Sequence, residues 1–340
     1  MHIKRKDLFG FILAILWSVS IGAQDPIYSQ FYNSPLQINP AFAGNNDAPF
    51  ISAVYRNQWI GLDNAYQTFS ASYDQYFENA NSGLGMSFLT DYAGGGSLRA
   101  TKVNAVYAYR LQVNRGSYIK AALDFGLGNR RLDWGRFTFY DAIDPIYGSV
   151  SPGGSAYPSS EVPPDLDNIS YFDLGTGVLY VTKKYYLGVG FSHINNPNNN
   201  FYLDRTANAN GLDLRWTVQA GYQYNFGDIR RGSGGARPDF IAPNFLFVNH
   251  GGFKQINAGL SIETHGLLGG MYYRHSDTNG DAAIVAFGGR TGPYKITYSF
   301  DYNLSKIALK GYGSHELSVV MNFDTGKPKI DISDCLQLFR

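Results

Sequence analysis

The stretch "QTFSASYDQYF" (residues 67–77) alternates between two kinds of side chain. Polar residues occupy one set of alternate positions and apolar residues the other: Thr68, Ser70, Ser72 and Asp74 against Phe69, Ala71 and Tyr73. A period of two is typical of a β-strand with one wet face and one apolar face. The fold therefore depends on whether such apolar faces meet a protein core or lipid.

The composition is rich in aromatic residues and low in charge. Of 340 residues, 44% are hydrophobic, 16% aromatic and 16% charged, and the formal net charge is +1. A charge so close to zero gives no electrostatic reason to bind nucleic acid, so we expect no nucleic-acid partner.

The first 23 residues have the pattern of a secretory signal peptide. A basic start is followed by an apolar run over residues 8–21 and by the small residues Gly22 and Ala23. We expect cleavage before Gln24 and export of the rest of the chain. No apolar run of about 18 residues follows, so a membrane position would require a β-barrel, which satisfies its backbone groups between strands.

Fourteen segments have the period of a strand. They cover residues 50–58, 67–76, 83–92, 100–113, 117–130, 171–181, 185–194, 214–226, 240–249, 254–264, 267–276, 282–290, 294–304 and 313–323. The connections between them broadly alternate between long and short, with residues 227–239 as a long exception among the short ones. Outer-membrane barrels sort their loops and turns in this way. The fold class we expect is all-β, a transmembrane barrel of about 14 antiparallel strands whose apolar faces meet lipid.

The inward faces of this barrel would carry charge, for example Lys102, Arg110 and Asp124. Such a lumen is either filled with water, or its charged groups pair with one another and with a plug. Both alternatives remain open from the sequence.

An even number of strands places both chain ends on the periplasmic side. The expected organisation is a signal peptide (1–23), a periplasmic N-terminal segment (24–49), the barrel (50–323) and a periplasmic C-terminal tail (324–340). The connection at residues 131–170 faces outward. Cys335, the one cysteine, lies in the tail and cannot form an internal disulfide.

Four motifs resemble those of one family. They are "QDPIYSQFYNSPLQINPAFAG" (24–44), "YYLGVGFSHINNPN" (185–198), "KITYSFDYNLSKI" (295–307) and "GSHELSVVMNF" (313–323). In this order they are similar to the PorP/SprF outer-membrane proteins of Bacteroidetes. The resemblance implies a barrel attached to the type IX secretion system and linked to gliding. It also implies two partners: a secreted adhesin or its C-terminal domain, exported or anchored at the surface, and a peptidoglycan-binding, OmpA-like periplasmic protein.

Two sets of residues are candidates for partner binding. In "INPAFAG" (38–44), Asn39, Pro40, Phe42 and Gly44 form a periplasmic docking strand, an internal plug or a simple turn. In the basic connection at residues 227–239, Arg230, Arg231 and Arg237 either dock an acidic partner or belong to a solvated loop.

The sequence offers little support for a catalytic site. Ser314 and His315 are neighbours on a strand and point to opposite faces, so Ser314 and Glu316 are better explained as a polar pair inside the barrel. The other histidines of the predicted barrel lack metal-ligand spacing, and "DTNGD" (277–281) departs from a calcium loop and fits a hairpin turn at Asn279-Gly280. We assign no catalytic, cofactor or metal site.

The predicted function is that of a non-enzymatic barrel in the outer membrane of a Gram-negative, Bacteroidetes-like bacterium. It contacts outer-membrane lipid and supports the export or surface anchoring of a type IX secretion substrate. The alternative is a porin-like channel or a channel for hydrophobic solutes.

Overall fold

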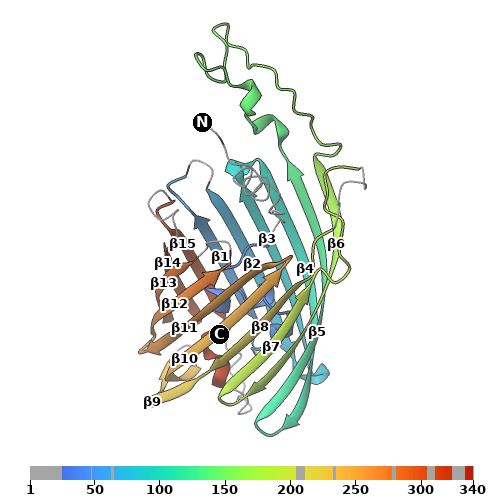
Figure 1. Cartoon of the computed structure of the whole chain (residues 1–340). Coiled ribbons are helices and arrows are strands. Elements are labelled where there is room, and N and C mark those ends of the chain that lie inside the picture. The colour runs from blue at the N-terminus through green and yellow to red at the C-terminus, as the bar shows by residue number, and fades with distance from the viewer. Residues whose placement is uncertain are drawn as a thin grey trace, which may run out of the picture.

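The computed structural model describes residues 25–46, 48–62, 65–203, 211–232, 235–277, 281–304, 311–323 and 334–339. The expected signal peptide and the Asn279-Gly280 turn lie outside this part of the chain. Within it, antiparallel strands form a closed barrel (Figure 1).

The wall consists of fifteen strand segments. They are β1 (Phe50–Gln58), β2 (Tyr66–Phe77), β3 (Ser82–Ala93), β4 (Leu98–Asn114), β5 (Ser117–Leu132), β6 (Asn168–Thr182), β7 (Tyr185–Ser192), β8 (Arg215–Tyr222), β9 (Tyr224–Gly232), β10 (Gly235–His250), β11 (Phe253–Thr264), β12 (Leu267–Ser276), β13 (Ala282–Thr291), β14 (Tyr294–Asn303) and β15 (Ser314–Asn322). Apart from β8 and β9, neighbours along the chain pair with each other, and β15 pairs with β1 to close the ring.

Segments β8 and β9 are two halves of one strand, so the barrel has the predicted fourteen strands. Both pair with β10, and the register that joins Gly221 to Asn244 continues unchanged to Tyr224 and Ile241. Between these pairs lies Pro243, which has no N–H to donate to a ladder.

The prediction of a long loop at residues 227–239 is wrong. Here β9 and β10 continue as a paired hairpin, with Arg230 opposite Arg237 and Gly232 opposite Gly235. The stretch carries little apolar alternation and is rich in glycine, so its strand character comes from pairing with the opposite strand and not from a buried face.

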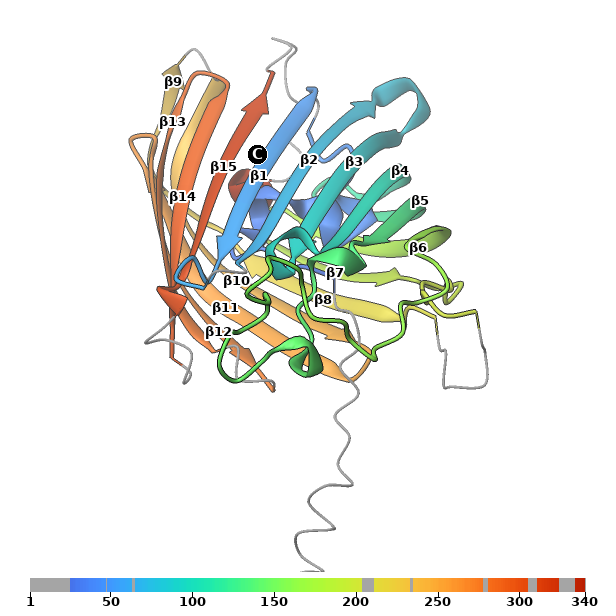
Figure 2. The same cartoon turned by 90° about the horizontal axis from the view of Figure 1, so that it is seen from above.

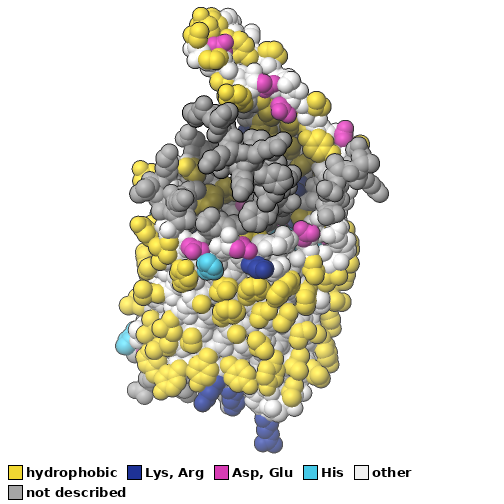
Figure 3. Space-filling view, in the orientation of Figure 1, with side chains coloured by type: hydrophobic (Ala, Val, Ile, Leu, Met, Phe, Trp, Pro, Cys, Tyr) yellow, Lys and Arg dark blue, Asp and Glu magenta, His cyan; other side chains and the backbone are white. Residues whose placement is uncertain are grey.

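The faces of β2 answer the question raised by residues 67–77. Ser70 and Asp74 are each 2% exposed, whereas Phe69 is 38% and Tyr73 42% exposed. This burial is inverted relative to a soluble protein, in which the apolar face would be covered. The same inversion around the wall produces the belt of hydrophobic side chains in Figure 3, which matches the lipid-facing band of a membrane barrel.

The two rims differ in the length of their connections. At the lower rim of Figure 1 the connections in the described part of the chain are tight, namely residues 78–81, 115–116, 183–184, 265–266 and 292–293. The upper rim carries the longer ones, including residues 133–167 between β5 and β6, which rise above the barrel. The predicted broad alternation of long and short connections is confirmed; the two-residue connection 251–252 is short although it lies at the upper rim, and the former exception at residues 227–239 disappears.

Short 3₁₀ turns make up the rest of the regular structure. Their bounds are η1 (Phe31–Asn33), η2 (Pro35–Gln37), η3 (Pro40–Phe42), η4 (Glu78–Ala80), η5 (Gly94–Gly96), η6 (Trp134–Arg136), η7 (Tyr140–Ala142) and η8 (Asp334–Phe339). In the described part of the chain, no helix has the length and apolar character needed to cross a membrane.

The N-terminal segment lies inside the barrel and not beneath it in the periplasm (Figure 2). Asp25 lies at the upper end of the lumen, where its backbone N–H donates to His250 (3.3 Å). The chain then descends through η1, η2 and η3 to the lower end, where β1 begins at Phe50. This placement differs from the expected periplasmic position of residues 24–49. The polar inward face of the strands supplies hydrogen-bond partners that hold the segment in the lumen.

The lipid-facing assignment can be tested at Leu123, which is 51% exposed near the middle of β5. The Leu123→Arg variant should lower the free energy of unfolding by about 2–4 kcal/mol, because it places a charge in the hydrocarbon. Urea unfolding in lipid vesicles measures this change. Leu123→Phe is the matched control and should stay close to the parent, and an equal effect of both variants would contradict the assignment.

Candidate functional site

The candidate site is the filled lumen. We call residues 25–46 the N-terminal plug and η8 the C-terminal cap. From Tyr28 to Phe42 every residue of the N-terminal plug except Gln37 is buried, although none of them belongs to a strand. The wall must therefore provide both space and polar partners for this segment.

Space for the turn that begins η3 comes from glycines. The Asn39 side chain accepts from the Ala41 N–H (2.9 Å) and donates to Gln219 Oε1 (3.0 Å) on β8. A Cβ at Gly177 on β6 would lie 2.0 Å from Asn39 Oδ1, and one at Gly190 on β7 would lie 2.7 Å from the carbonyl oxygen of Ile38. Glycines of β6 and β7 thus make room in the wall for the Asn-Pro turn.

The lower end of the N-terminal plug is held in the same way. Gly44 has φ +65° and lies against Gly83 of β3, so that a Cβ at Gly44 would be 2.6 Å from the Gly83 Cα. The Gly44 N–H donates to Asp74 Oδ1 (2.7 Å). Lys120 donates to Ala43 O and to Asn45 Oδ1, so a basic residue of the wall provides hydrogen bonds to carbonyl oxygens of the plug.

A buried ion cluster joins the N-terminal plug to β1, β12, β14 and β15. Arg56 lies between Asp301 (2.9 Å) and Glu316 (3.0 Å), and Arg274 makes a second ion pair with Asp301 (2.8 Å). The Ser29 hydroxyl donates to Asp301 (2.6 Å), and its N–H donates to Glu316 (2.9 Å). Two arginines balance two carboxylates, and the plug's polar groups add a hydrogen bond to each acid.

A second cluster anchors the upper end of the plug. His193, which follows β7, contacts Asp25 through Nε2 (3.1 Å) and Asp173 through Nδ1 (3.0 Å). Lys102 pairs with Asp173 (2.5 Å), and the His250 ring stacks on His193 at 5.2 Å. The spacing of these histidines in the sequence carries no signal of this juxtaposition, which comes from the pairing of β8 with both β7 and β10: Arg215 lies opposite Ser192 on one side and opposite His250 on the other.

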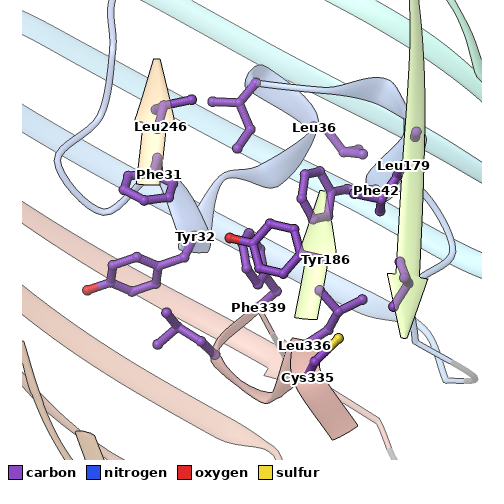
Figure 4. Close-up of a cluster of buried hydrophobic side chains, with 14 of the residues drawn as sticks. Phe31, Tyr32, Leu36, Phe42, Leu179, Tyr186, Leu246, Cys335, Leu336 and Phe339 are labelled. Carbon is purple, nitrogen blue, oxygen red and sulfur yellow. The ribbon is translucent and has the colours of Figure 1, made fainter. Parts of the chain in front are cut away.

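The C-terminal cap closes an apolar cluster near the lower end (Figure 4). Phe339 stacks on Phe42 at 4.8 Å, and Tyr186 of β7 packs edge-on against Phe339 at 5.2 Å. Lys295 of β14 donates to the carbonyl oxygen of Leu338 (2.6 Å), and Cys335 is buried. The described end of the tail therefore packs in the lumen and contacts the INPAFAG motif directly.

The expected positions of the Ser-His-Glu residues are confirmed. Ser314 and Glu316 face the lumen and are 0% and 1% exposed, whereas His315 contacts Tyr298 (2.6 Å) on the other face of the wall. Ser314 and His315 do not hydrogen-bond to each other as a nucleophile and its base would.

The candidate docking residues fall into two places. Asn39, Pro40, Phe42 and Gly44 are all in the lumen, where their contacts are with this chain. Arg230 and Arg231 are in β9 and Arg237 is in β10, at the lower rim. The side chains of the three arginines lie outside the described part of the chain.

The longest upper connection is an ordered surface loop. Asp141 accepts hydrogen bonds from the Ser160 N–H (2.6 Å) and the Ser159 hydroxyl (2.7 Å), which hold the pKa of its carboxyl group at about 2. Trp134 packs on Phe139 at 4.8 Å. We call residues 133–167 the outer loop.

Comparison with protein families assigns this architecture. The family described as "Type IX secretion system membrane protein PorP/SprF" matches residues 20–321. The chain belongs to the PorP/SprF family. As a PorP/SprF protein with a closed barrel, it is a secretion-related protein of the outer membrane of a Gram-negative bacterium.

The motifs that carried the PorP/SprF resemblance meet in the lumen. The N-terminal motif forms the plug, and the motif at 185–198 supplies Gly190, one of the glycines that make room for the Asn-Pro turn. The motifs at 295–307 and 313–323 supply Asp301 and Glu316 of the ion cluster. The resemblance therefore lies largely in how the plug is held.

Comparison with curated proteins finds no match. Among solved structures, Omp33 of Acinetobacter baumannii is 10% identical and covers 82% of this chain and 100% of its own, with a TM-score of 0.42. The toluene transporter TodX of Pseudomonas putida is 10% identical over 88% and 97% of the two chains (TM-score 0.44). The monoaromatic hydrocarbon channel CymD is 12% identical over 89% and 95% (TM-score 0.45). Likenesses this low say nothing of what this PorP/SprF chain does.

The ion cluster makes a direct prediction for this PorP/SprF barrel. Asp301→Ala leaves Arg56 and Arg274 buried with one carboxylate between them, and should destabilise the protein by about 3–5 kcal/mol. Thermal unfolding in detergent measures the loss. The exposed Asp277→Ala is the control and should change stability by less than about 0.5 kcal/mol. If both variants unfold at the parent temperature, the cluster does not hold the plug.

Proposed function

We propose that this chain is a non-enzymatic outer-membrane anchor of the type IX secretion system, which binds a secreted substrate such as a large adhesin and supports its export or attachment at the surface. The upper rim faces outward and the lower rim faces the periplasm. The observation that carries the proposal is the combination of a filled lumen with a large ordered loop on one rim.

The filled lumen favours binding over passage through the barrel. Arg56, Asp301 and Glu316 are at most 3% exposed at their side chains, and the N-terminal plug connects them. Removing the plug would leave these groups without its hydrogen bonds, which is unfavourable for buried charges. For Asn39, Pro40, Phe42 and Gly44, we accordingly favour the internal-plug alternative over direct contact with a partner.

The outer loop offers a surface for the substrate. Its side chains include Tyr140, Ile146 and Val162, which are 93%, 82% and 72% exposed. Apolar groups kept in water on an ordered loop are typical of interaction sites. A second upper connection supports the loop, because the Leu203 N–H donates to Asp165 (2.8 Å).

The partners implied by the family remain part of the proposal. An adhesin or its C-terminal domain would bind at the outer loop. A peptidoglycan-binding, OmpA-like protein would bind at the periplasmic rim, where Arg230, Arg231 and Arg237 lie, and would link the barrel to the envelope and to gliding.

The outer loop can be replaced without cutting into the wall, because β5 ends at Leu132 and β6 begins at Asn168. Exchange of residues 133–167 for a short Gly-Ser linker should abolish substrate display and leave the barrel in the membrane. Whole-cell immunolabelling of the substrate measures display, and heat-modifiability on gels reports the folded barrel. Normal display with a folded barrel would overturn the proposal.

A milder variant separates contact from folding. The triple variant Tyr140→Ser, Ile146→Ser and Val162→Ser should reduce display by about tenfold, since exposed apolar anchors carry most of the affinity of an interface. Its matched control in the same loop is Ser149→Ala, Ser155→Ala and Glu161→Gln, which should display the substrate normally.

The channel alternative makes the opposite prediction for conductance. The plugged lumen should give no steady ion current when the purified full chain is inserted into a planar bilayer. A stable open level like that of a porin would favour the channel over the anchor.

A further inference from the structure

The hairpin of β9 and β10 leaves one strand edge open at the lower rim. On the side away from β10, β8 pairs with β7. This pairing ends where Tyr185, the first residue of β7, lies opposite Tyr222, the last residue of β8. Residues 224–232 continue past this point, and in the described part of the chain β9 pairs only with β10. Figure 1 shows this hairpin at the lower edge of the barrel. We call residues 224–239 the arm.

An open edge presents a row of backbone N–H and C=O groups to any extended chain. Proteins usually cover or blunt such an edge, and a two-stranded ribbon is only marginally stable by itself. In the arm, β10 carries Pro238 at a register shift, which removes a donor from that strand. The nine residues of β9 contain no proline, so its edge keeps all its donors.

The charge of the arm indicates what kind of chain can pair with its open edge. Arg230 lies opposite Arg237 in the register, and Arg231 is next to Arg230. Of the two acidic residues in the arm, Asp239 already accepts from Thr264 (2.8 Å) and from the His265 N–H (3.1 Å). The arm is therefore basic, with net charge +1 from three arginines and two aspartates.

The rim beside the arm has the same sign. The neighbouring turns expose Arg115, Lys183 and Lys184, and the backbone carbonyl oxygen of Lys184 accepts from the Gln223 N–H just before the arm (2.7 Å). Figure 3 shows Lys and Arg side chains at the lower end of this face. A second copy of the arm would bring like charges together, whereas an acidic chain would be attracted.

We propose that the edge of β9 receives an extended acidic segment of a periplasmic protein, which adds one strand to the arm by backbone pairing and is selected by the basic rim. Main-chain hydrogen bonds would provide the binding and charge the specificity, as in other cases of strand addition. The proposal rests on the orientation proposed above, in which the lower rim faces the periplasm. It does not depend on what the outer loop binds.

Hydrogen exchange of the full-length protein tests the proposal directly. Amides of residues 224–232 are compared in outer-membrane fragments from cells that display the substrate and in the purified protein in detergent, by quenched digestion and mass spectrometry. We expect their exchange to be slower by about tenfold or more in the native membrane, because the added strand protects the outward N–H groups.

Matched variants separate charge from folding. R230E/R231E/R237E should remove the protection of β9 in the native membrane and leave the barrel folded, which heat-modifiability on gels reports. R99E/R131E is the control, because it reverses a cross-strand pair of exposed arginines at the upper rim. It should leave the protection of β9 unchanged.

Three results would overturn the proposal. Equal exchange of β9 in the native membrane and in detergent would mean that no strand is added. Protection that grows with concentration in the purified protein would identify a second copy of the chain as the occupant. Protection that survives R230E/R231E/R237E would rule out an acidic segment. Loss of substrate display upon loop replacement is a separate result, so either proposal can fail without the other.

Discussion

The interior of this barrel depends on the pairing of Arg56 with Asp301 and Glu316. A wall of fourteen strands encloses a lumen too wide for its own side chains to fill, and charges on the inward face need partners when water is excluded. The plug residue Ser29 donates to both carboxylates. The ion cluster therefore neutralises the wall and at the same time attaches the N-terminal plug.

Similar contacts between the plug and the wall occur along the length of the lumen. At the upper end Asp25 meets His193, in the middle Asn39 fits against the glycines of β6 and β7, and at the lower end Lys120 binds the plug's carbonyl groups. These contacts attach the plug to the neighbouring strands β5, β6 and β7, whereas the ion cluster attaches it to β1, β12, β14 and β15, so the plug connects separate parts of the ring. A plug held at three levels makes the barrel a rigid support, and function is then carried by the rims: a large loop on one side and a basic arm on the other.

The strands were predictable because their signal is local. In residues 67–77 the polarity of each side chain indicates the face of the strand on which it lies, and the other segments show the same period of two. The arm was not predictable in this way, because residues 227–239 have no buried face to impose a period. The plug remained one of three alternatives for another reason: the sequence "INPAFAG" indicates the local turn, which Asn39 and Gly44 do form, but not the environment in which the turn is placed. One clue was available, since the inward charges of the strands required either water or a partner.

By itself, the sequence determined the barrel, its strand number, the lipid-facing side of each strand and the difference between the rims. All of these follow from alternation and from connection length, which are properties of short segments. Only the tertiary structure decided that the N-terminal segment and the end of the tail lie in the lumen, that His193 meets His250, and that β9 has an open edge. These features depend on the order and register of strand pairing and on the closure of the sheet around the plug, which bring together residues whose separation along the chain carries no information about their distance in space.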